Sequence, residues 1–376
     1  MAGIYLHIPY CKTKCPYCDF YSITDTRSKT QLIQALLKEL ELRKDYLTGK
    51  SVQTIYFGGG TPSLMKLEEL EKILDYIQTH FNVLDNPEIT IECNPDDLSL
   101  DYLKVLKKIG NFRLNLGVQS FHDDELQLLE RRHDAAKSQN VLKDVFHLGF
   151  KNVGIDLIYG LPGSRSNDLL SNLKTAFQYP IQHLSAYHLT IEPGTPFYQR
   201  LLSNDIHEIS DEESRNQFFL LLEQARIHGF EQYEISNFAR NQHYSKHNTS
   251  YWQGVPYLGI GPSAHSFNGT DRHKNVSGII PYLEQINSGE KACTVDKISY
   301  TDRFNEYLLV SLRTKWGLSK QVLQEQFPDF INAHFYKQID SYFERGWMTG
   351  DDEGYYLTDE GQFISDTILS DLFVVD

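Results

Sequence analysis

The sequence predicts an α/β fold, with a partial (β/α)6 barrel in residues 1–235 and a smaller helical, winged-helix-like domain in residues 296–376. In about the first 200 residues, six short apolar runs alternate with amphipathic stretches. This alternation implies a parallel sheet with right-handed crossover helices. Six units are too few for a closed eight-stranded barrel. We therefore expect an incomplete barrel that is open on one side.

The six expected strands are short and largely apolar, as strands buried on both faces are. They are Ile4–Ile8, Thr54–Phe57, Glu88–Glu92, Arg113–Val118, Val153–Ile158 and His183–Leu189. Helical periodicity predicts the helices Gln31–Tyr46, Leu67–Phe81, Ser99–Ile109, Asp123–Glu130, Ala136–Leu148, Asp168–Phe177 and Glu213–Ile227. A strand-like stretch at Glu231–Ile235 completes this part of the chain.

The remaining chain changes character twice. Periodicity fades from residue 236 to about 276, so we interpret residues 236–295 as a loop-rich segment over the mouth of the barrel. Helices are then expected at Arg303–Leu312, Ser319–Phe327 and Ala333–Arg345, followed by a hairpin at Trp347–Leu357 and a last helix from Asp359. Helices followed by a hairpin indicate a winged-helix arrangement.

Composition narrows the class of protein. The 376 residues carry 36 Lys and Arg against 50 Asp and Glu, a net charge of −14, which argues against a nucleic-acid partner. The N-terminus lacks a signal-peptide pattern, and no apolar run reaches the roughly 18 residues of a membrane span. Three of the five cysteines are crowded, which is typical of metal ligands kept reduced in the cytoplasm.

Cys11, Cys15 and Cys18 follow the first expected strand with the spacing C-x3-C-x2-C. Soft thiolate ligands favour zinc or an iron–sulfur cluster. A structural zinc site takes four ligands, and the other two cysteines lie far along the chain. A [4Fe–4S] cluster held by three cysteines leaves one iron open for an exchangeable ligand. A zinc knuckle completed by His7 and a chance cluster of thiols are the alternatives.

Glycines and polar side chains stand at or near the carboxyl ends of the expected strands, where α/β barrels build their active sites. Gly58-Gly59-Gly60-Thr61-Pro62 follows the second strand, and three glycines let a backbone approach a ligand closely. Glu92 closes the third strand, Gln119 follows the fourth and Asp156 lies within the fifth. A carboxylate can accept ribose hydroxyls, and a glutamine can pair with hydroxyls or an adenine edge. Arg131 can hold a carboxylate bidentately. The alternatives are a tight turn for the glycines, a helix cap or salt-bridge partner for each of the three polar residues, and a solvated charge run for Arg131.

The cysteine spacing, with Tyr17 just before the third cysteine, resembles the signature of the radical S-adenosylmethionine (SAM) family. This resemblance implies a [4Fe–4S] cluster whose open iron is chelated by SAM, and reductive cleavage of SAM to a 5′-deoxyadenosyl radical. It also implies that the glycine-rich stretch after the second strand contacts the amino group of SAM.

Nearly the whole chain resembles one branch of that family, the oxygen-independent coproporphyrinogen III oxidases and the related haem chaperones. In this branch two SAM molecules can occupy the site. The resemblance implies Tyr5, Gly59 and Glu92 for the first SAM, and Tyr17, Gly60, Thr61, Gln119, Arg131 and Asp156 for the second. Thr190 and His265 fall where later cofactor contacts occur.

Two departures from the oxidase pattern argue against decarboxylation of coproporphyrinogen. Phe20 stands where the oxidases have a further cysteine, and only ten residues precede Cys11, where the oxidases carry an N-terminal extension. His247-Asn-Thr-Ser-Tyr251-Trp252 resembles a motif typical of the haem chaperones. A histidine can ligate haem iron axially and aromatic rings can lie against the macrocycle. A histidine capping a turn beside core aromatics is the alternative.

We therefore expect a haem chaperone that binds haem, transfers it to an acceptor protein and carries a SAM-coordinating [4Fe–4S] cluster. A membrane haemoprotein is one candidate acceptor. An oxygen-independent coproporphyrinogen III dehydrogenase is the alternative enzyme, and a zinc-binding winged-helix regulator is a third hypothesis. No residue stands out as a general acid or base for decarboxylation, so no catalytic residue is assigned.

Overall fold

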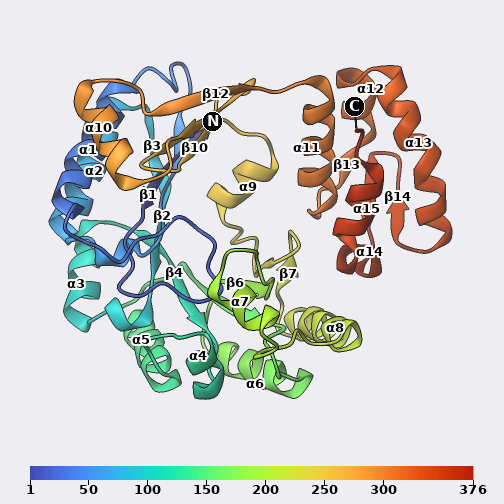
Figure 1. Ribbon diagram of the computed structural model, residues 1–376, viewed down its shortest axis with the longest axis horizontal. Helices are drawn as coiled ribbons and strands as arrows, with labels where there is room; N and C mark the ends of the chain where they lie inside the picture. The colour runs from blue at the N-terminus through green and yellow to red at the C-terminus, as the bar shows by residue number, and fades with distance from the viewer. Residues whose placement is uncertain (376) are drawn as a thin grey trace.

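Six parallel strands form the centre of the main sheet. The computed structural model describes residues 1–375, and Figure 1 shows the strands side by side with helices around them. The strands are β1 (Ala2–Ile8), β2 (Val52–Gly59), β3 (Val83–Cys93), β4 (Phe112–Gln119), β5 (Val153–Tyr159) and β6 (His183–His188). Each pairs in parallel with the next, which confirms the predicted partial α/β barrel.

The crossover helices bury apolar residues against the strands. They are α1 (Lys29–Leu42), α2 (Leu67–His80), α3 (Leu100–Ile109), α4 (Asp123–Leu128), α5 (Ala135–His147) and α6 (Ser166–Ala176), with short 3-10 turns at Pro62–Leu64 and Pro95–Asp97. In α1, Leu32, Leu36 and Leu40 recur every fourth residue and are fully buried. Ser99 caps α3 by accepting a hydrogen bond from Tyr102 N, as its position predicts.

The expectation of a loop-rich segment at residues 236–295 is wrong. After α7 (Pro196–Leu202), α8 (Asp211–Ile227) and β7 (Glu231–Gln232), the chain forms β8 (Asn237–Ala239), α9 (Lys246–Trp252), β9 (Tyr257–Ile260), β10 (His265–Phe267), β11 (Asp271–Asn275), α10 (Ile279–Ser288) and β12 (Cys293–Lys297). Strand β9 pairs in parallel with β1, and β10 to β12 extend the sheet beyond it. These strands span three to five residues, too few for a periodic pattern to show.

A buried polar network ties this segment to α1. The carboxylate of Glu39 accepts hydrogen bonds from Asn275 Nδ2 (2.8 Å), Tyr282 Oη (2.7 Å) and Gly261 N (2.8 Å). Arg43, the C-cap residue of α1, donates to the Gly259 carbonyl at 3.0 Å. Because buried polar groups need partners, these bonds fix how the segment packs against the barrel.

The C-terminal part has its own hydrophobic core, around Phe304, Leu308 and Phe335. It consists of α11 (Tyr300–Leu312), β13 (Leu318–Ser319), α12 (Lys320–Gln326), α13 (Asp329–Glu344), β14 (Met348–Gly350), β15 (Gly354–Leu357), α14 (Asp359–Phe363) and α15 (Ser365–Leu372). The predicted hairpin is confirmed as β14 and β15. Among the described residues, no helix is long and apolar enough to cross a bilayer. The domain boundaries at residues 235 and 295 stay a prediction.

Candidate functional site

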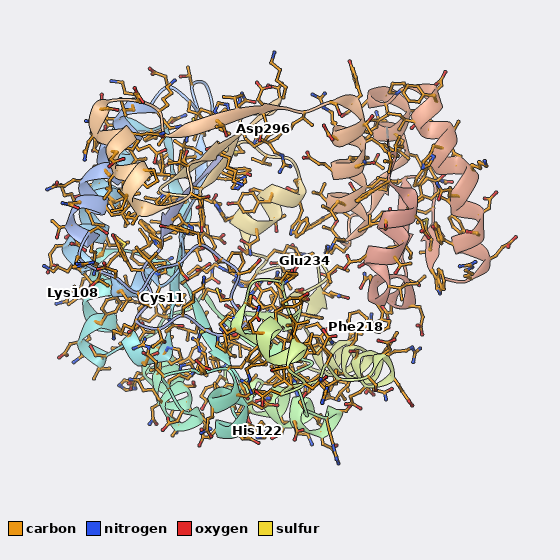
Figure 2. All side chains as sticks on the ribbon, in the orientation of Figure 1. Cys11, Lys108, His122, Phe218, Glu234 and Asp296 are labelled. Atoms are coloured by element: carbon orange, nitrogen blue, oxygen red, sulfur yellow. The ribbon has the colours of Figure 1, made fainter. Side chains whose placement is uncertain are left out.

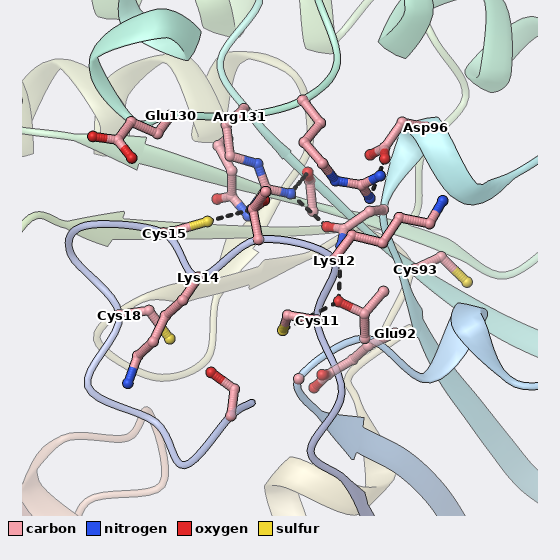
Figure 3. A pocket seen from close by; sticks show the side chains of 18 of the residues that line it. Cys11, Lys12, Lys14, Cys15, Cys18, Glu92, Cys93, Asp96, Glu130 and Arg131 are labelled. Atoms are coloured by element: carbon pink, nitrogen blue, oxygen red, sulfur yellow. Dashed lines mark hydrogen bonds and ion pairs between the residues drawn. The ribbon is translucent and has the colours of Figure 1, made fainter. Parts of the chain in front are cut away.

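Three cysteines surround one small cavity after β1. The loop that carries them is closed by hydrogen bonds from Cys11 N to Ile23 O (2.9 Å) and from Cys18 N to Cys15 O (3.2 Å). Figure 2 places Cys11 inside the main unit, whereas Lys108 lies at its outer surface. All three cysteines line a cavity of about 140 Å³, and Figure 3 shows them around it. The loop thus presents three soft ligands to one space.

The thiols of this loop need a positive partner to ionise. Burial raises the pKa of Cys11 and of Cys18, and the neighbouring thiols raise both further. Thr61 Oγ1 donates to Cys11 Sγ at 3.4 Å, and Arg131 Nη1 donates to Cys15 Sγ at 3.3 Å. Bound iron supplies the positive charge that keeps such thiols ionised. The donor set therefore fits a cluster held by three cysteines.

His7 does not complete a zinc site with these cysteines. Its Nδ1 accepts a hydrogen bond from Tyr5 Oη at 3.1 Å, and its Nε2 donates to the Tyr21 carbonyl at 3.0 Å. Across residues 1–375, no three His, Cys, Asp or Glu side chains stand close enough to hold a single metal ion. His7, with both ring nitrogens bonded, is therefore not available as the fourth ligand of a zinc knuckle.

Arg131 joins the cysteine loop to two strand ends. Besides Cys15 Sγ, its guanidinium donates to Asn94 Oδ1 and, at 3.1 Å, to the Gly117 carbonyl. Its Nη1 also lies 3.4 Å from Tyr17 Oη. Figure 3 shows the guanidinium of Arg131 directed toward Cys15. Arg131 is therefore held within the cavity rather than belonging to a solvated charge run.

The glycine stretch after β2 lets the backbone lie against the cysteine loop. Gly59 adopts φ +113°, a conformation that side chains disfavour, and a Cβ there would lie 2.8 Å from the ring of His7. A Cβ on Gly60 would lie 2.8 Å from the backbone of Pro9 and Tyr10. Both glycines line the cluster cavity together with Thr61. The positive φ and the nearby His7 ring are therefore the physical reason for glycine at position 59, and close packing of two backbones is the reason at position 60.

Two half-buried carboxylates line the interior of the barrel. Glu92 accepts hydrogen bonds from Tyr56 Oη (2.7 Å) and Gly59 N (3.1 Å), and Asp156 accepts one from Asn115 Nδ2 (2.9 Å). Burial, and then the charge of Asp156, raise the pKa of Glu92 to about 7; burial raises the pKa of Asp156 to about 6. Asp156 Oδ1 has no hydrogen-bond partner. A ligand with hydroxyl donors or positive charge would relieve both carboxylates.

Gln119 is aimed into the same interior by a β-bulge. The pairing of β4 with β5 shifts register between Gly117 and Gln119. Gln119 itself adopts φ +67°, which is uncommon for a residue other than glycine. Bulges re-aim side chains, and strained residues cluster at functional sites. Gln119 lines both the cluster cavity and the adjoining barrel interior, a cavity of about 400 Å³.

The remaining candidates, Thr190, Tyr5 and His265, line cavities that adjoin the cluster cavity. Thr190 lines the barrel interior with Tyr17 and Glu92. Tyr5 and His265 line a third and much larger cavity of about 1210 Å³, which also reaches Glu92. The large cavity and the cluster cavity therefore meet at a shared carboxylate.

His247 is set apart from the other candidates. Its side chain is 1 % exposed and does not line any of these three cavities. Thr54 Oγ1 lies 2.8 Å from its Nδ1, and Tyr251 Oη lies 2.8 Å from its Nε2. Burial lowers the pKa of His247 to about 3. Both ring nitrogens are thus already bonded inside the protein.

Sequence reasoning missed three polar residues of the site. Tyr56 holds Glu92, Asn115 holds Asp156, and Asn94 accepts from Arg131 while donating to Thr61 Oγ1 at 3.1 Å. Tyr56 and Asn115 interrupt apolar strands, and Asn94 follows β3 directly. Polar residues within a strand buried on both faces are the signal that identifies them.

A partial parallel barrel with a triple-cysteine loop after its first strand defines a radical SAM protein. Residues 5–176 match the Radical SAM superfamily model, and residues 298–364 match the HemN C-terminal domain. Family membership brings a SAM-coordinating [4Fe–4S] cluster. The fold is similar to that of coproporphyrinogen III oxidase HemN from Escherichia coli, with a TM-score of 0.85, 23% identity, and coverage of 99% of this chain and 90% of that chain.

Curated relatives give the narrower family. The chain is 32% identical to the haem chaperone HemW of Bacillus subtilis, over 98% of each protein. It is 28% identical to haem chaperone HemW of Lactococcus lactis, over 99% of this chain and 97% of that protein. The identity to haem chaperone HemW of Escherichia coli is 35%, over 70% of this chain and 69% of that protein. The chain therefore belongs to the HemW haem-chaperone family.

Proposed function

We propose that this protein binds haem and transfers it to an acceptor protein in the cytoplasm, with a SAM-coordinating [4Fe–4S] cluster as its resident cofactor. The observation that carries the proposal is the similarity to haem chaperone HemW of Bacillus subtilis, which extends over 98% of both chains. Phe20, at the position where the oxidases have a cysteine, supports a chaperone over a decarboxylase.

The chain's own residues fit this cofactor. Cys11, Cys15 and Cys18 hold the cluster, which supplies an open coordination position and, when reduced, an electron. Arg131 places a fixed positive charge beside the thiolates, which favours their ionised form. Asp156 Oδ1 has no hydrogen-bond partner in the protein, which matches an adenosyl ligand with its hydroxyls, and Glu92 lines the same cavity.

We assign the two SAM positions by their shared cavities. Tyr5, Gly59 and Glu92 all line the large cavity, and Gly59 and Glu92 also line the cluster cavity. These three residues serve the first SAM. The residues for the second SAM all line the cluster cavity and are Tyr17, Gly60, Thr61, Gln119, Arg131 and Asp156. Thr190 lies at the rim of the adjoining interior. The acceptor is a haemoprotein, and a membrane-associated one is the candidate class.

Haem titration of the anaerobically reconstituted protein tests this function. We expect a saturable Soret band at one haem per chain and transfer of that haem to an added apo-haemoprotein. Incubation with SAM, reductant and coproporphyrinogen should yield no protoporphyrinogen. Robust turnover without stoichiometric haem binding would reverse the assignment in favour of the dehydrogenase.

The cluster is tested separately by iron analysis. Cys15→Ser removes one of the three thiolate ligands, so the reconstituted variant should lose most of its iron and its brown absorbance. Cys293→Ser, in β12 and outside the cluster cavity, is the matched control and should retain both. Equal iron content in the two variants contradicts the assignment of the ligands.

A further inference from the structure

A large cavity lies between the sheet and the C-terminal helices. Its volume of about 1210 Å³ exceeds the roughly 300–1,000 Å³ of ordinary small-ligand sites. One wall is the β10–β11 hairpin with the end of α9; the opposite wall is α11 and α12. Arg272 Nη2 on β11 pairs with Glu306 Oε2 on α11 at 3.0 Å, so the two walls are tied together.

The walls of this cavity are aromatic, as a flat macrocycle requires. Tyr257 and Phe267 face each other in the β9–β10 pair, and Tyr251 packs edge-on against Tyr257 with ring centroids 4.5 Å apart. Trp252 and Phe327 contribute from α9 and from the turn after α12. Aromatic faces provide large contact areas for a planar ligand at little cost in side-chain entropy.

A single face of the β10–β11 hairpin combines a histidine with two cations. His265 lies directly opposite Lys274 in this antiparallel pair, and Phe267 lies opposite Arg272. Alternate residues of a strand share a face, so these four side chains project on the same side, and all four line the cavity. Arg303 faces them from α11. Within residues 1–375, the side chains of Lys274 and Arg303 make no hydrogen bond or ion pair, so both are free to bind carboxylates.

Of the three histidines at or near this cavity, His265 has the available imidazole. Both nitrogens of His7 and both nitrogens of His247 are hydrogen-bonded to other groups. The ring of His265 has no hydrogen-bond partner among the described residues. Burial, and then the nearby cations, lower the pKa of His265, which keeps the imidazole in the neutral form that binds metals.

We infer that the part of this cavity between the β10–β11 hairpin and α11 is the haem site, that His265 ligates the haem iron, and that Lys274 and Arg303 bind the two propionates. The inference rests on the proposed function and adds the place where the cargo lies. Phe20, 69 % exposed, lines both this cavity and the barrel interior. Haem in the cavity therefore lies next to the SAM and cluster site.

The structure assigns a positioning role to His247. It bonds to Tyr251 Oη, and Tyr251 in turn packs on Tyr257 in the cavity wall. Thr54 Oγ1, on β2, fixes the other nitrogen of the imidazole. The His-Asn-x-x-Tyr-Trp motif thus fixes the aromatic wall of the haem site to the sheet, and His247 does not itself ligate the iron.

Haem titration of the cluster-loaded chain tests the axial ligand. His265→Ala should change the Soret position, lose the iron–imidazole signal in resonance Raman spectra and bind haem at least about tenfold more weakly. Added imidazole should restore the spectrum. His273→Ala, on the same hairpin but with its ring against Tyr46, is the control and should match the wild-type protein. His247→Ala should weaken binding while keeping the iron–imidazole signal.

Propionate recognition is tested with haem and its dimethyl ester. Arg303→Glu should weaken haem binding at least about tenfold, the effect of one lost charge-assisted contact, and leave binding of the dimethyl ester unchanged. Lys337→Glu on α13, outside the cavity, is the charge-matched control. A wild-type chain that binds no haem contradicts the proposed function itself. Wild-type binding with an unaltered spectrum in His265→Ala, or loss of the iron–imidazole signal in His247→Ala alone, overturns this site while the function stands.

Discussion

Replacing Glu92 with Gln should change how the stability of the protein depends on pH. The pKa of Glu92 is raised from 4.5 to about 7 by burial and then by Asp156. The folded chain therefore holds its proton more tightly than the unfolded chain, and this contribution to stability is present below pH 4.5 and is lost as the pH rises toward 7. At about 1.4 kcal/mol per pH unit, the full shift corresponds to about 3.5 kcal/mol, of which about 2 to 3 kcal/mol is lost between pH 4.5 and 7 because the slope is smaller near each pKa.

The assay is urea unfolding of the wild-type protein and of Glu92→Gln at several pH values, followed by circular dichroism. Gln keeps an acceptor for Tyr56 but cannot ionise. The free energy of unfolding of the wild-type protein should therefore fall between pH 4.5 and 7 by about 2 to 3 kcal/mol more than that of Glu92→Gln. Any constant cost of the substitution cancels in this comparison. Glu71→Gln, exposed on α2, is the control and should follow the wild-type curve. Parallel curves for wild-type and Glu92→Gln would refute the reasoning.

Two further predictions concern the buried ion pair at the end of α1 and the glycine stretch beside the cysteine loop. Arg43→Ala leaves a buried carboxylate without its counter-ion and should cost about 3 to 5 kcal/mol, read as a large drop in Tm, whereas Lys44→Ala, in an exposed pair, should leave Tm unchanged. Gly60→Ala places a Cβ 2.8 Å from neighbouring backbone and should lower both iron content and SAM affinity. Gly110→Ala, whose Cβ would meet nothing nearer than 3.6 Å, should lower neither.

The sequence predicted those residues of the candidate site that lie at or near the carboxyl ends of strands. Parallel strands bring their carboxyl ends to one edge, so Gly60, Glu92, Gln119 and Asp156 meet although they are far apart in the chain. The partners that hold them were not predicted. Asn115 lies in the interior of β4, and its role depends on the register with β5, which places Asp156 two residues beyond the position opposite Asn115.

The motif around His247 shows the limit of reasoning from residue type. The motif of His247, Tyr251 and Trp252 indicates a haem contact, but it does not tell whether the imidazole or the aromatic rings make that contact. The fold buries His247 against β1 and β2 with both ring nitrogens bonded, whereas Tyr251 and Trp252 line the large cavity. Burial depends on long-range packing, which no local pattern encodes.

By itself the sequence determined the six β/α units and the triple-cysteine loop, because periodicity and ligand spacing are local properties of the chain. Only the tertiary structure decided that β9 lies beside β1, since strands of three to five residues leave no periodic trace. It also decided that the β10–β11 hairpin faces α11 across one large cavity. The segments that form this cavity are distant in sequence. The cavity therefore exists only once they have packed together in the folded protein.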